Sequence, residues 1–249
     1  MNAIIIAAGS GKRISKDVKN IPKSMVKVNG KPIIQYQLDV LKKNGVDEIY
    51  VITGPYSKEF NLKNIKYLKD TNYSKHDILG SLMEAEKFLK NDVLVLYSDI
   101  IFDSKIIKQI LKSKKDISIA VDMNWEKMYE KRSEHPKTEA ENVQIKNKNK
   151  IVKIKKNISN VNKDVGEFLG IIKFTSTGAQ SFIKQYKKII KNDKKVFHEA
   201  SSILKGYLTD MIQELIDSKI NIEPIFISGK WCEIDTMQDL KKAEKIFKN

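Results

Sequence analysis

The first 25 residues of this 249-residue chain constrain its fold and chemistry more than any other stretch. An apolar run rich in Ile covers residues 2–7, and a short run of small and basic residues follows at 8–13. An uninterrupted apolar run of this length is typical of a buried strand in a parallel sheet. Small residues directly after such a strand let backbone N–H groups approach an anion, and Lys12, Arg13 and Lys23 add positive charge. The stretch therefore predicts a site for a polyphosphate.

Two well-known glycine motifs do not fit this loop. The dinucleotide-binding motif requires G-x-G-x-x-G and an acidic residue about 20 positions later, at the end of a second strand. Here Ile14 takes the third glycine position, and the next predicted strand ends in Thr53-Gly54. The P-loop requires an earlier glycine and a Ser or Thr after the lysine, but Arg13 follows Lys12. An ordinary glycine-rich turn between a strand and a helix is the alternative.

Length and composition exclude several classes of protein. A chain of this length suits one large α/β domain, or one with a modest insertion, and can bury a sizeable core. Cys232 is the single cysteine, so a disulfide framework and a cysteine metal cluster are both excluded. The sequence has no secretory signal and no long apolar span, so we expect a cytoplasmic protein without membrane insertion.

The net charge of +15 raises the hypothesis of nucleic-acid binding. However, the lysines are spread along the whole chain, and aromatic residues do not alternate with them as stacking platforms would require. We therefore expect no nucleic-acid partner. The charge still draws smaller anions, including nucleotides, towards the surface.

Strands alternate with helices along the chain, which predicts βαβ units and a mostly parallel sheet. Pro32 is expected to open the first helix and Gly45 to close it. We expect strands at 2–7, 25–28, 48–53, 65–68, 92–97, 117–121, 165–174 and 222–227, helices at 32–45, 82–89, 105–111, 177–191, 198–217 and from Thr236, and a β-hairpin at 143–156.

Acidic residues follow the predicted strands at informative places. Asp99 lies just past the strand at 92–97, in the crevice where open α/β sheets bind ligands, so we expect it to be a metal ligand. Asp103 is expected to cap the next helix. Near the C-terminus, Thr236 and Asp239 have the spacing of a capping box. If Thr236 caps the last helix, Asp235 is available for another role. The alternative is that Asp235 itself caps this helix.

The pattern Ala7-Ala8-Gly9-x-Gly11-x-Arg13, followed by Pro22-Lys23-x-Met25, resembles the signature of the sugar-phosphate nucleotidyltransferase superfamily. The resemblance implies a three-layer α/β/α fold with a mostly parallel mixed sheet and a β-hairpin-bearing insertion. It implies a single domain over 1–249, with a nucleotide-binding half at 1–121 and an acceptor-binding half at 122–249. The chain departs from the family pattern between Arg13 and Pro22. The implied nucleotide-binding residues are Ala7, Ala8, Gly9, Ser10, Gly11, Lys12, Arg13, Lys23, Asp77, Gly80, Ser81 and Ser98.

Similar family members place the nucleobase against a segment that corresponds to 72–82. Gly80 would permit close approach of a ring, and Ser81 can donate to and accept from a pyrimidine edge. The alternative is that Asp77 or Ser81 simply caps the following helix.

The block 122–141 resembles nucleotidyltransferases associated with phosphoenolpyruvate mutase in phosphonate pathways. It shares with them Val-Asp-x-x-Trp, Tyr-x-x-Arg, His-Pro and Glu-Ala-Glu, and Gly-Glu-Phe-x-Gly follows at 166–170. Trp-x-Glu-Ile-Asp-Thr at 231–236 matches the second metal-binding segment of the family, which implies Mg²⁺ held by Asp99 and Asp235. The implied acceptor-binding residues are Tyr129, Arg132, His135, Glu167, Trp231 and Glu233.

Several of these residues have a structural alternative. Trp125 and Tyr129 share a helical face and can pack against each other. Arg132 can pair with Glu139 or Glu141. Glu167 can pair with a lysine, because a carboxylate between small and apolar neighbours needs a partner.

The resemblance implies a cytidylyltransferase that transfers CMP from CTP to a small phosphonate or phosphomonoester and releases pyrophosphate. Its product would be a CDP-type or CMP-phosphonate intermediate for the decoration of surface polysaccharide or lipid. Both reactants are anions, so charge neutralisation and positioning dominate catalysis, through Mg²⁺, Arg13, Lys23, Asp99 and Asp235. The acceptor oxygen is already ionised, so no general base is needed.

The acceptor and the reaction class have alternatives. Phosphocholine would require an aromatic cage, for which Trp125, Tyr129, Tyr207 and Trp231 are candidates. A sugar-1-phosphate nucleotidyltransferase and a nucleotide-binding regulatory module without catalysis are the other functions considered. A homo-oligomer is compatible with the sequence.

Overall fold

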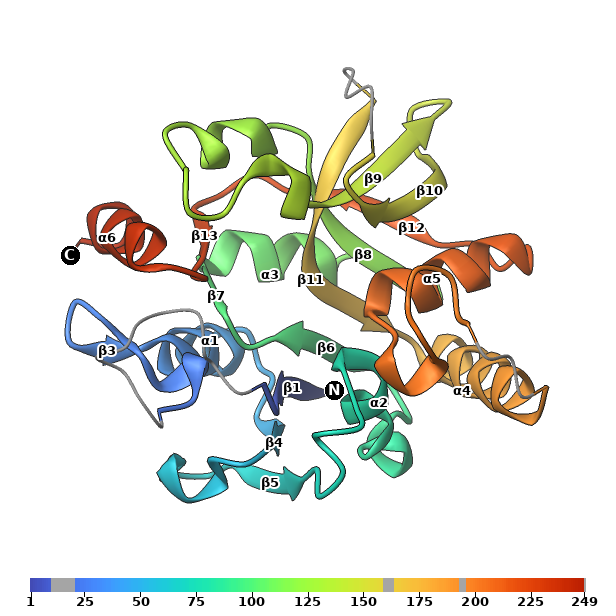
Figure 1. Cartoon of the computed structure of the whole chain (residues 1–249), viewed down its shortest axis with the longest axis horizontal. Helices are drawn as coiled ribbons and strands as arrows, with labels where there is room; N and C mark the ends of the chain where they lie inside the picture. The colour runs from blue at the N-terminus through green and yellow to red at the C-terminus, as the bar shows by residue number, and fades with distance from the viewer. Residues whose placement is uncertain (10–20, 159–163, 193–195, 249) are drawn as a thin grey trace.

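The computed structural model describes residues 1–9, 21–158, 164–192 and 196–248. Their helices pack around one mixed sheet (Figure 1). Within these residues the sheet has nine strands, seven of them in the order β10-β9-β11-β6-β1-β4-β5, while β8 pairs with β11 and β12. Strands β1, β4, β5 and β6 run parallel, as does the pair β8 and β12, whereas β11 runs antiparallel to its three neighbours. The strands are β1 (Asn2–Ala7), β4 (Glu48–Thr53), β5 (Lys66–Lys69), β6 (Val93–Tyr97), β8 (Ile117–Asp122), β9 (Glu141–Lys146), β10 (Lys150–Lys156), β11 (Val165–Phe174) and β12 (Glu223–Phe226).

Helices cover both faces of this sheet (Figure 1). Alternate side chains of β1 enter different cores: Ile4 and Ile6 join the one that includes α2, α4 and α5, while Ala3 and Ile5 join the one that includes α1 and α3. A strand buried on both faces has no polar alternation, which explains its continuous apolar sequence. The three-layer α/β/α prediction is therefore confirmed. The helices are α1 (Ile33–Lys43), α2 (Ile78–Met83), α3 (Ser104–Leu111), α4 (Ser176–Lys191), α5 (Leu208–Asp217) and α6 (Met237–Ile246).

Strand β11 joins the two parts of the sheet. All ten of its residues are buried, and it pairs with β6, β8 and the β9–β10 hairpin, which forms as predicted. Its pairing with β8 shifts register between Phe168 and Ile172, and Gly170 there has a positive φ of 65°. A Cβ atom on Gly170 would lie 2.2 Å from the ring of Tyr97. The bulge thus makes room for Tyr97 at the end of β6.

Two short strands outside the main sheet were not predicted. Strands β7 (Ile100–Phe102) and β13 (Trp231–Glu233) pair antiparallel, with Glu233 opposite Ile100. The N–H of Ile234 continues the ladder by donating to the carbonyl of Asp99 at 2.9 Å. Three residues are too few to show a period of two, so only the fold reveals this pairing.

A second small pair follows the segment at 21–26. A 3₁₀ helix over Lys23–Met25 leads into β2 (Lys27–Val28), which pairs with β3 (Lys31–Pro32) across an Asn29-Gly30 turn. The strand predicted at 25–28 is thus shortened, and α1 begins at Ile33, one residue after Pro32.

Two predicted helices are wrong in extent. The helix predicted at 82–89 is α2, which begins at Ile78 and ends at Met83, before a 3₁₀ helix over Glu86–Phe88. The helix predicted at 198–217 begins only at Leu208. The carboxylate of Asp210 accepts the N–H of Tyr207 at 2.8 Å, which fixes the start of α5, and a 3₁₀ helix over Ile203–Lys205 precedes it. Further 3₁₀ helices cover Ser57–Glu59, Trp125–Tyr129 and Lys137–Glu139.

Among the helices of the described ranges, none combines the length and the apolar character needed to cross a membrane.

Replacement of Gly170 by Ala tests whether the bulge is needed to accommodate the ring of Tyr97. We expect Gly170→Ala to lower the free energy of unfolding by about 2–5 kcal/mol, because a left-handed alanine costs about 1–2 kcal/mol and overpacking about 1–3 kcal/mol more. Gly45 also has a positive φ, 75°, but a Cβ there would meet nothing within 4 Å. Gly45→Ala should therefore show only the backbone cost. Urea unfolding followed by circular dichroism measures both, and equal losses would contradict a role for the Tyr97 ring.

Candidate active site

One lysine lies between two acidic residues from distant parts of the chain. The ammonium of Lys23 contacts Asp99 Oδ2 at 2.8 Å and Asp235 Oδ1 at 2.6 Å. The side chains of Lys23 and Asp235 expose only 15% and 4% of their surface, and that of Asp99 exposes 26%. The structure therefore brings together three of the four predicted catalytic residues. The fourth, Arg13, lies outside the described residues.

The backbone explains why these acids meet. Asp99 precedes β7 and Asp235 follows β13 by two residues, so the antiparallel pairing of the two strands places both at the same end. Buried Gln37 of α1 supports this turn by donating to the carbonyls of Tyr97 and Ile100 at 2.8 and 2.7 Å. The position of each acid is thus fixed by backbone pairing rather than by its own side chain.

The alternative of Asp235 as a helix cap is not what the structure shows. Thr236 accepts the N–H of Asp239 at 3.3 Å, and the Asp239 carboxylate accepts the N–H of Thr236 at 2.9 Å. This capping box was predicted from the sequence, as was the cap of α3 by Asp103. The Asp235 carboxylate instead faces Lys23, His135 Nδ1 at 3.3 Å and a guanidinium nitrogen of Arg132 at 3.7 Å.

The charges around Asp99 and Asp235 favour a cation at this place. Burial works against the charge of Lys23, but Asp99, Asp235 and Glu233 outweigh it and raise the lysine's pKa above its ordinary value. The Oδ1 atom of Asp99 is buried and has no hydrogen-bond partner among the described residues. An unpartnered carboxylate oxygen beside a second carboxylate fits the hard oxygen ligands that Mg²⁺ prefers. His135, Glu233 and Asp235 also offer ligand atoms that lie within 4.8 Å of one another.

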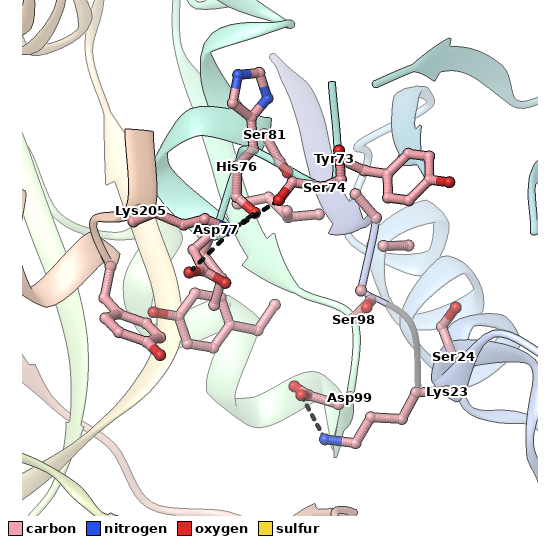
Figure 2. A pocket seen from close by; sticks show the side chains of 17 residues that line it. Lys23, Ser24, Tyr73, Ser74, His76, Asp77, Ser81, Ser98, Asp99 and Lys205 are labelled. Carbon is pink, nitrogen blue, oxygen red and sulfur yellow. Dashed lines mark hydrogen bonds and ion pairs between the residues drawn. The ribbon is translucent and has the colours of Figure 1, made fainter. Parts of the chain in front are cut away.

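A cavity of about 540 Å³ opens next to this cluster (Figure 2). In Figure 2, Lys23 and Asp99 lie at one end of it, while Ser81, His76 and Lys205 lie at the other. Seven of the predicted nucleotide-binding residues line it, namely Ala7, Ala8, Gly9, Lys23, Asp77, Ser81 and Ser98. Predicted residues Ser10, Gly11, Lys12 and Arg13 fall outside the described part of the chain. We call this the larger cavity.

Gly80 does not line the larger cavity. A Cβ on it would lie 2.5 Å from the carbonyl oxygen of Leu204 and 2.8 Å from the ring of His76. The absence of a side chain therefore serves the packing of α2 against residues 204 and 76, rather than the approach of a base. Asp77 occupies the position before α2, but its side chain makes no capping hydrogen bond.

Asp70 is a residue of the site that the sequence analysis missed. It is fully buried at the end of β5, and its carboxylate accepts the N–H of Asn72 and the hydroxyl of Ser81, both at 2.8 Å. His76 Nδ1 lies 3.0 Å from the same carboxylate. The signal that identified Asp99, an acid just past a strand end, also applies to Asp70. Lys205, which also lines the larger cavity, was missed as well, and Tyr207 was considered only as part of an aromatic cage for the acceptor.

A second, smaller cavity of about 30 Å³ adjoins the larger one and shares Tyr97 and Asp99 with it. Three predicted acceptor-binding residues, Glu167, Trp231 and Glu233, line it. The other lining residues are Ile100, Glu139, Glu141, Phe168 and Leu169.

The remaining predicted acceptor residues have structural partners. Tyr129 is 4% exposed and packs edge-on against Trp125, with ring centroids 5.4 Å apart, so the packing alternative for Trp125 is confirmed. Arg132 pairs with Asp239 at 2.6 Å and with Glu233 at 3.4 Å, not with Glu139 or Glu141. Among the described residues, neither cavity is lined by Tyr129, Arg132 or His135, and His135 Nδ1 lies 3.3 Å from Asp235 Oδ2.

Glu167 pairs with a tyrosine rather than a lysine. The hydroxyl of Tyr129 donates to its Oε1 at 2.5 Å, while its Oε2 is buried and unpartnered among the described residues. Burial raises the pKa of Glu167 to about 8, although Tyr129 and Arg132 act in the opposite direction. Burial likewise raises the pKa of Glu141 to about 7.

The raised pKa of Glu167 predicts a pH-dependent stability. Between pH 4.5 and about 8 the folded chain retains a proton that the unfolded chain releases, so this group lowers stability as the pH rises through that window. Glu167→Gln keeps the acceptor for Tyr129 and removes the penalty. At each pH we compare the Tm of the variant with that of wild type. We expect this difference to favour the variant by about 2–4 °C more at pH 8.5 than at pH 5. Calorimetry at both pH values checks this, with the surface variant Glu126→Gln as control; equal differences would contradict it.

Comparison with known proteins identifies the family of the chain. The pattern of the MobA-like NTP transferase domain matches residues 3–235. A CTP:phosphoglutamine cytidylyltransferase of Campylobacter jejuni subsp. jejuni serotype O:2 is 28% identical over 254 residues, which cover 97% of this chain and 98% of that protein. A choline-phosphate cytidylyltransferase of Streptococcus pneumoniae is 31% identical over 117 residues, 45% of this chain and 51% of the other.

Solved structures show the same fold. The CTP:phosphocholine cytidylyltransferase of Streptococcus pneumoniae superposes with a TM-score of 0.73 at 21% identity and covers 99% of both chains. The inositol-1-phosphate CTP transferase of T. maritima gives 0.72 at 19% identity, over 100% of this chain and 96% of that one. The chain belongs to the family of MobA-like NTP transferase domains and is a nucleotidyltransferase.

Proposed function

We propose that this enzyme transfers the CMP group of CTP to a small phosphorylated acceptor and releases pyrophosphate. The observation that carries the proposal is the cluster of Lys23, Asp99 and Asp235, in which Lys23 and Asp99 line the larger cavity and Asp99 also lines the smaller one. It provides charges of both signs at the place where a triphosphate in one cavity would meet an acceptor in the other. The names of the relatives, which specify CTP with phosphoglutamine or phosphocholine, support this choice.

The chemistry requires neutralisation of charge more than any nucleophile of the protein. An acceptor oxygen attacks the α-phosphorus in line, its bond to phosphorus forms as the bond to pyrophosphate breaks, and the leaving group carries the electron pair. Asp99 and Asp235 are the residues that would hold Mg²⁺, which supplies charge neutralisation at the phosphates when bound. Lys23 retains its positive charge near neutral pH and would contact phosphate oxygens from the same side.

The far end of the larger cavity supports a preference for cytosine. The hydroxyl of Ser81 has one proton, which it donates to buried Asp70 at 2.8 Å. Towards the cavity the oxygen can therefore only accept a hydrogen bond. The exocyclic amine of cytosine is a donor, whereas uracil has a carbonyl at that position. Ser81 would thus favour CTP over UTP.

The acceptor-side residues predicted from the phosphonate-pathway resemblance support a phosphonate or a phosphomonoester. A CDP-type or CMP-phosphonate product for surface decoration follows as part of the proposal. A sugar 1-phosphate is the alternative acceptor.

The decisive experiment measures pyrophosphate release with each of the four NTPs, Mg²⁺ and a panel of acceptors. The panel holds 2-aminoethylphosphonate, phosphocholine, phosphorylated amino acids and hexose 1-phosphates. We expect release with CTP and one of the first three classes. Release only with hexose 1-phosphates would favour the alternative, and no release at all would contradict the proposal.

Asp99→Asn tests the metal-site assignment. We expect kcat to fall by about 10²–10³-fold, the usual effect of removing one electrostatic contact to a transition state. The variant should keep a native circular dichroism spectrum, because Lys23 retains its ion pair with Asp235. Asp47→Asn, at the opposite end of the parallel strands, is the control and should retain full activity. Full activity of Asp99→Asn would exclude this residue as a metal ligand and favour a regulatory role for the site.

Ser81→Ala tests whether the Ser81 hydroxyl distinguishes cytosine from uracil. We expect kcat/KM for CTP to fall by roughly tenfold, the effect of one lost hydrogen bond, and kcat/KM for UTP to change less. UTP serves as the internal control, because both nucleotides share the ribose and phosphates. An equal loss for the two would show that Ser81 acts only through the packing of α2.

A further inference from the structure

A carboxylate lies buried behind the wall of the larger cavity. Asp70 directly follows the last residue of β5 and is fully buried, and it is not among the described residues that line the cavity. Its N–H donates to the carbonyl of Thr53 at 2.8 Å, which ties its backbone to the end of β4. A nucleotide in the cavity therefore does not touch Asp70, and the carboxylate can influence the nucleotide only through the residues between them.

The Asp70 carboxylate meets a donor on each of three sides. Its Oδ1 accepts the N–H of Asn72 at 2.8 Å, and its Oδ2 accepts the hydroxyl of Ser81 at 2.8 Å. His76 Nδ1 lies 3.1 Å from Oδ1 and 3.0 Å from Oδ2. Ser81 and His76 both line the larger cavity, at the opposite end from Lys23 (Figure 2). One buried charge thus holds both of these side chains.

An ionised carboxylate only accepts hydrogen bonds, so it decides where the protons of its neighbours point. Ser81 has one hydroxyl proton, and Asp70 accepts it. A neutral imidazole has one N–H, and a carboxylate beside Nδ1 places the proton there and leaves Nε2 without one. Neither Ser81 nor the neutral ring of His76 then has a proton left to donate to a ligand.

A serine without such a partner would not distinguish the two pyrimidines. Its hydroxyl rotates freely, and it can donate to the O4 carbonyl of uracil as readily as it accepts from the amine of cytosine. In this site, turning the Ser81 proton towards a carbonyl would take a donor from a buried carboxylate, and a hydrogen bond to a charged group is stronger than one between neutral groups. Discrimination therefore originates in Asp70, behind the hydroxyl, rather than in the hydroxyl itself.

We propose that Asp70 is a positioning residue that sets the base preference of the larger cavity by holding the Ser81 hydroxyl as a hydrogen-bond acceptor. The inference rests on the proposed function and adds to it the origin of selectivity for a 4-amino pyrimidine over a 4-oxo pyrimidine. Asp70 acts on the base through Ser81 and contacts neither the base nor the phosphates.

Asp70→Asn reverses these hydrogen bonds while it keeps the shape of the side chain. The amide oxygen takes the place of Oδ1, because an amide nitrogen there would face the N–H of Asn72 as a second donor. The amide nitrogen then takes the place of Oδ2, where its two protons meet Ser81 Oγ and His76 Nδ1. Ser81 no longer gives its proton to residue 70 and can donate it to the O4 carbonyl of uracil.

Isothermal titration calorimetry with CTP and with UTP, each with Mg²⁺ and without an acceptor, measures the preference apart from turnover. We expect the wild-type enzyme to bind CTP at least about tenfold more tightly than UTP, because UTP would place a carbonyl against an acceptor. We expect Asp70→Asn to bind UTP more tightly than the wild type does, and to lower the preference for CTP at least about tenfold. Exposed Asp47→Asn is the matched control and should keep the wild-type preference.

Two outcomes of this titration would contradict the inference. An equal loss of affinity for both nucleotides in Asp70→Asn would show that the carboxylate only supports the fold of the turn. The absence of a preference in the wild-type enzyme would show that Ser81 is not held as an acceptor.

A double variant tests whether Asp70 acts through the hydroxyl. In the background of Ser81→Ala, we expect Asp70→Asn to leave the ratio of the CTP and UTP affinities unchanged, since no hydroxyl remains to be turned. A further shift of the ratio in the double variant would mean that Asp70 acts on the base by another route, and would overturn the inference.

The tautomer of His76 keeps the inference testable if Asp70→Asn does not give a native circular dichroism spectrum. ¹⁵N NMR of the wild-type enzyme with labelled histidine, at a pH where the ring is neutral, distinguishes the protonated from the unprotonated nitrogen, and His76→Gln assigns the signals. We expect the proton on Nδ1. A proton on Nε2 would mean that Asp70 donates to the ring, so the carboxyl group could not be the fixed acceptor that the inference requires.

Turnover separates this inference from the proposed function. A preference for CTP that Asp70→Asn removes, without pyrophosphate release with any acceptor, would contradict nucleotidyl transfer and leave the role of Asp70 in place. Pyrophosphate release from CTP, with a base preference that Asp70→Asn does not change, would support the transfer reaction and overturn the role of Asp70.

Discussion

The ion pairs of Lys23 with Asp99 and Asp235 are the contact on which the arrangement of the site depends. Both carboxylates are held by the backbone pairing of β7 with β13, and each would repel the other without a cation between them. Because burying two neighbouring carboxylates without a cation is costly, a cation between them serves the fold as well as the chemistry. The lysine meets that requirement in the protein alone, and a divalent ion would meet it in the presence of a triphosphate.

The two cavities differ in electrostatic character although they share a wall. The larger one is bounded by the cations Lys23 and Lys205 as well as by Asp77 and Asp99. The smaller one is bounded by five acids and by apolar and aromatic side chains, among them Tyr97, for which Gly170 makes room. Positive charge is therefore available to the phosphates of a substrate in the larger cavity only.

The sequence predicted the parts of the fold that depend on long apolar runs and on turn chemistry. Strands β1 and β6 are buried on both faces, so their composition alone identifies them, and Asp99 follows from its place after β6. Strands β7 and β13 are too short for any periodicity, although they bring Asp235 to Asp99. Glu141 stood in a recognised motif, yet its contact with Tyr97 depends on how β11 separates β6 from β9. The segment at 198–207 was predicted to be helical, whereas it contains turns and the 3₁₀ helix over Ile203–Lys205. The start of α5 depends on the hydrogen bond from the N–H of Tyr207 to Asp210, which the apolar pattern does not reveal.

The dependence of the site on β13 also bears on synthesis of the chain at the ribosome. Strands β1, β4, β5 and β6 lie early in the sequence and can pair as they emerge, together with the first half of the larger cavity. Lys23 then has Asp99 as a partner, but Asp235 follows only after most of the chain has been made. Likewise, the ion pair of Arg132 with Asp239 can form only after residue 239 has been synthesised. A nascent chain therefore lacks the second acid of the site until residue 235 has emerged, and it becomes competent for catalysis only after β13 has paired with β7.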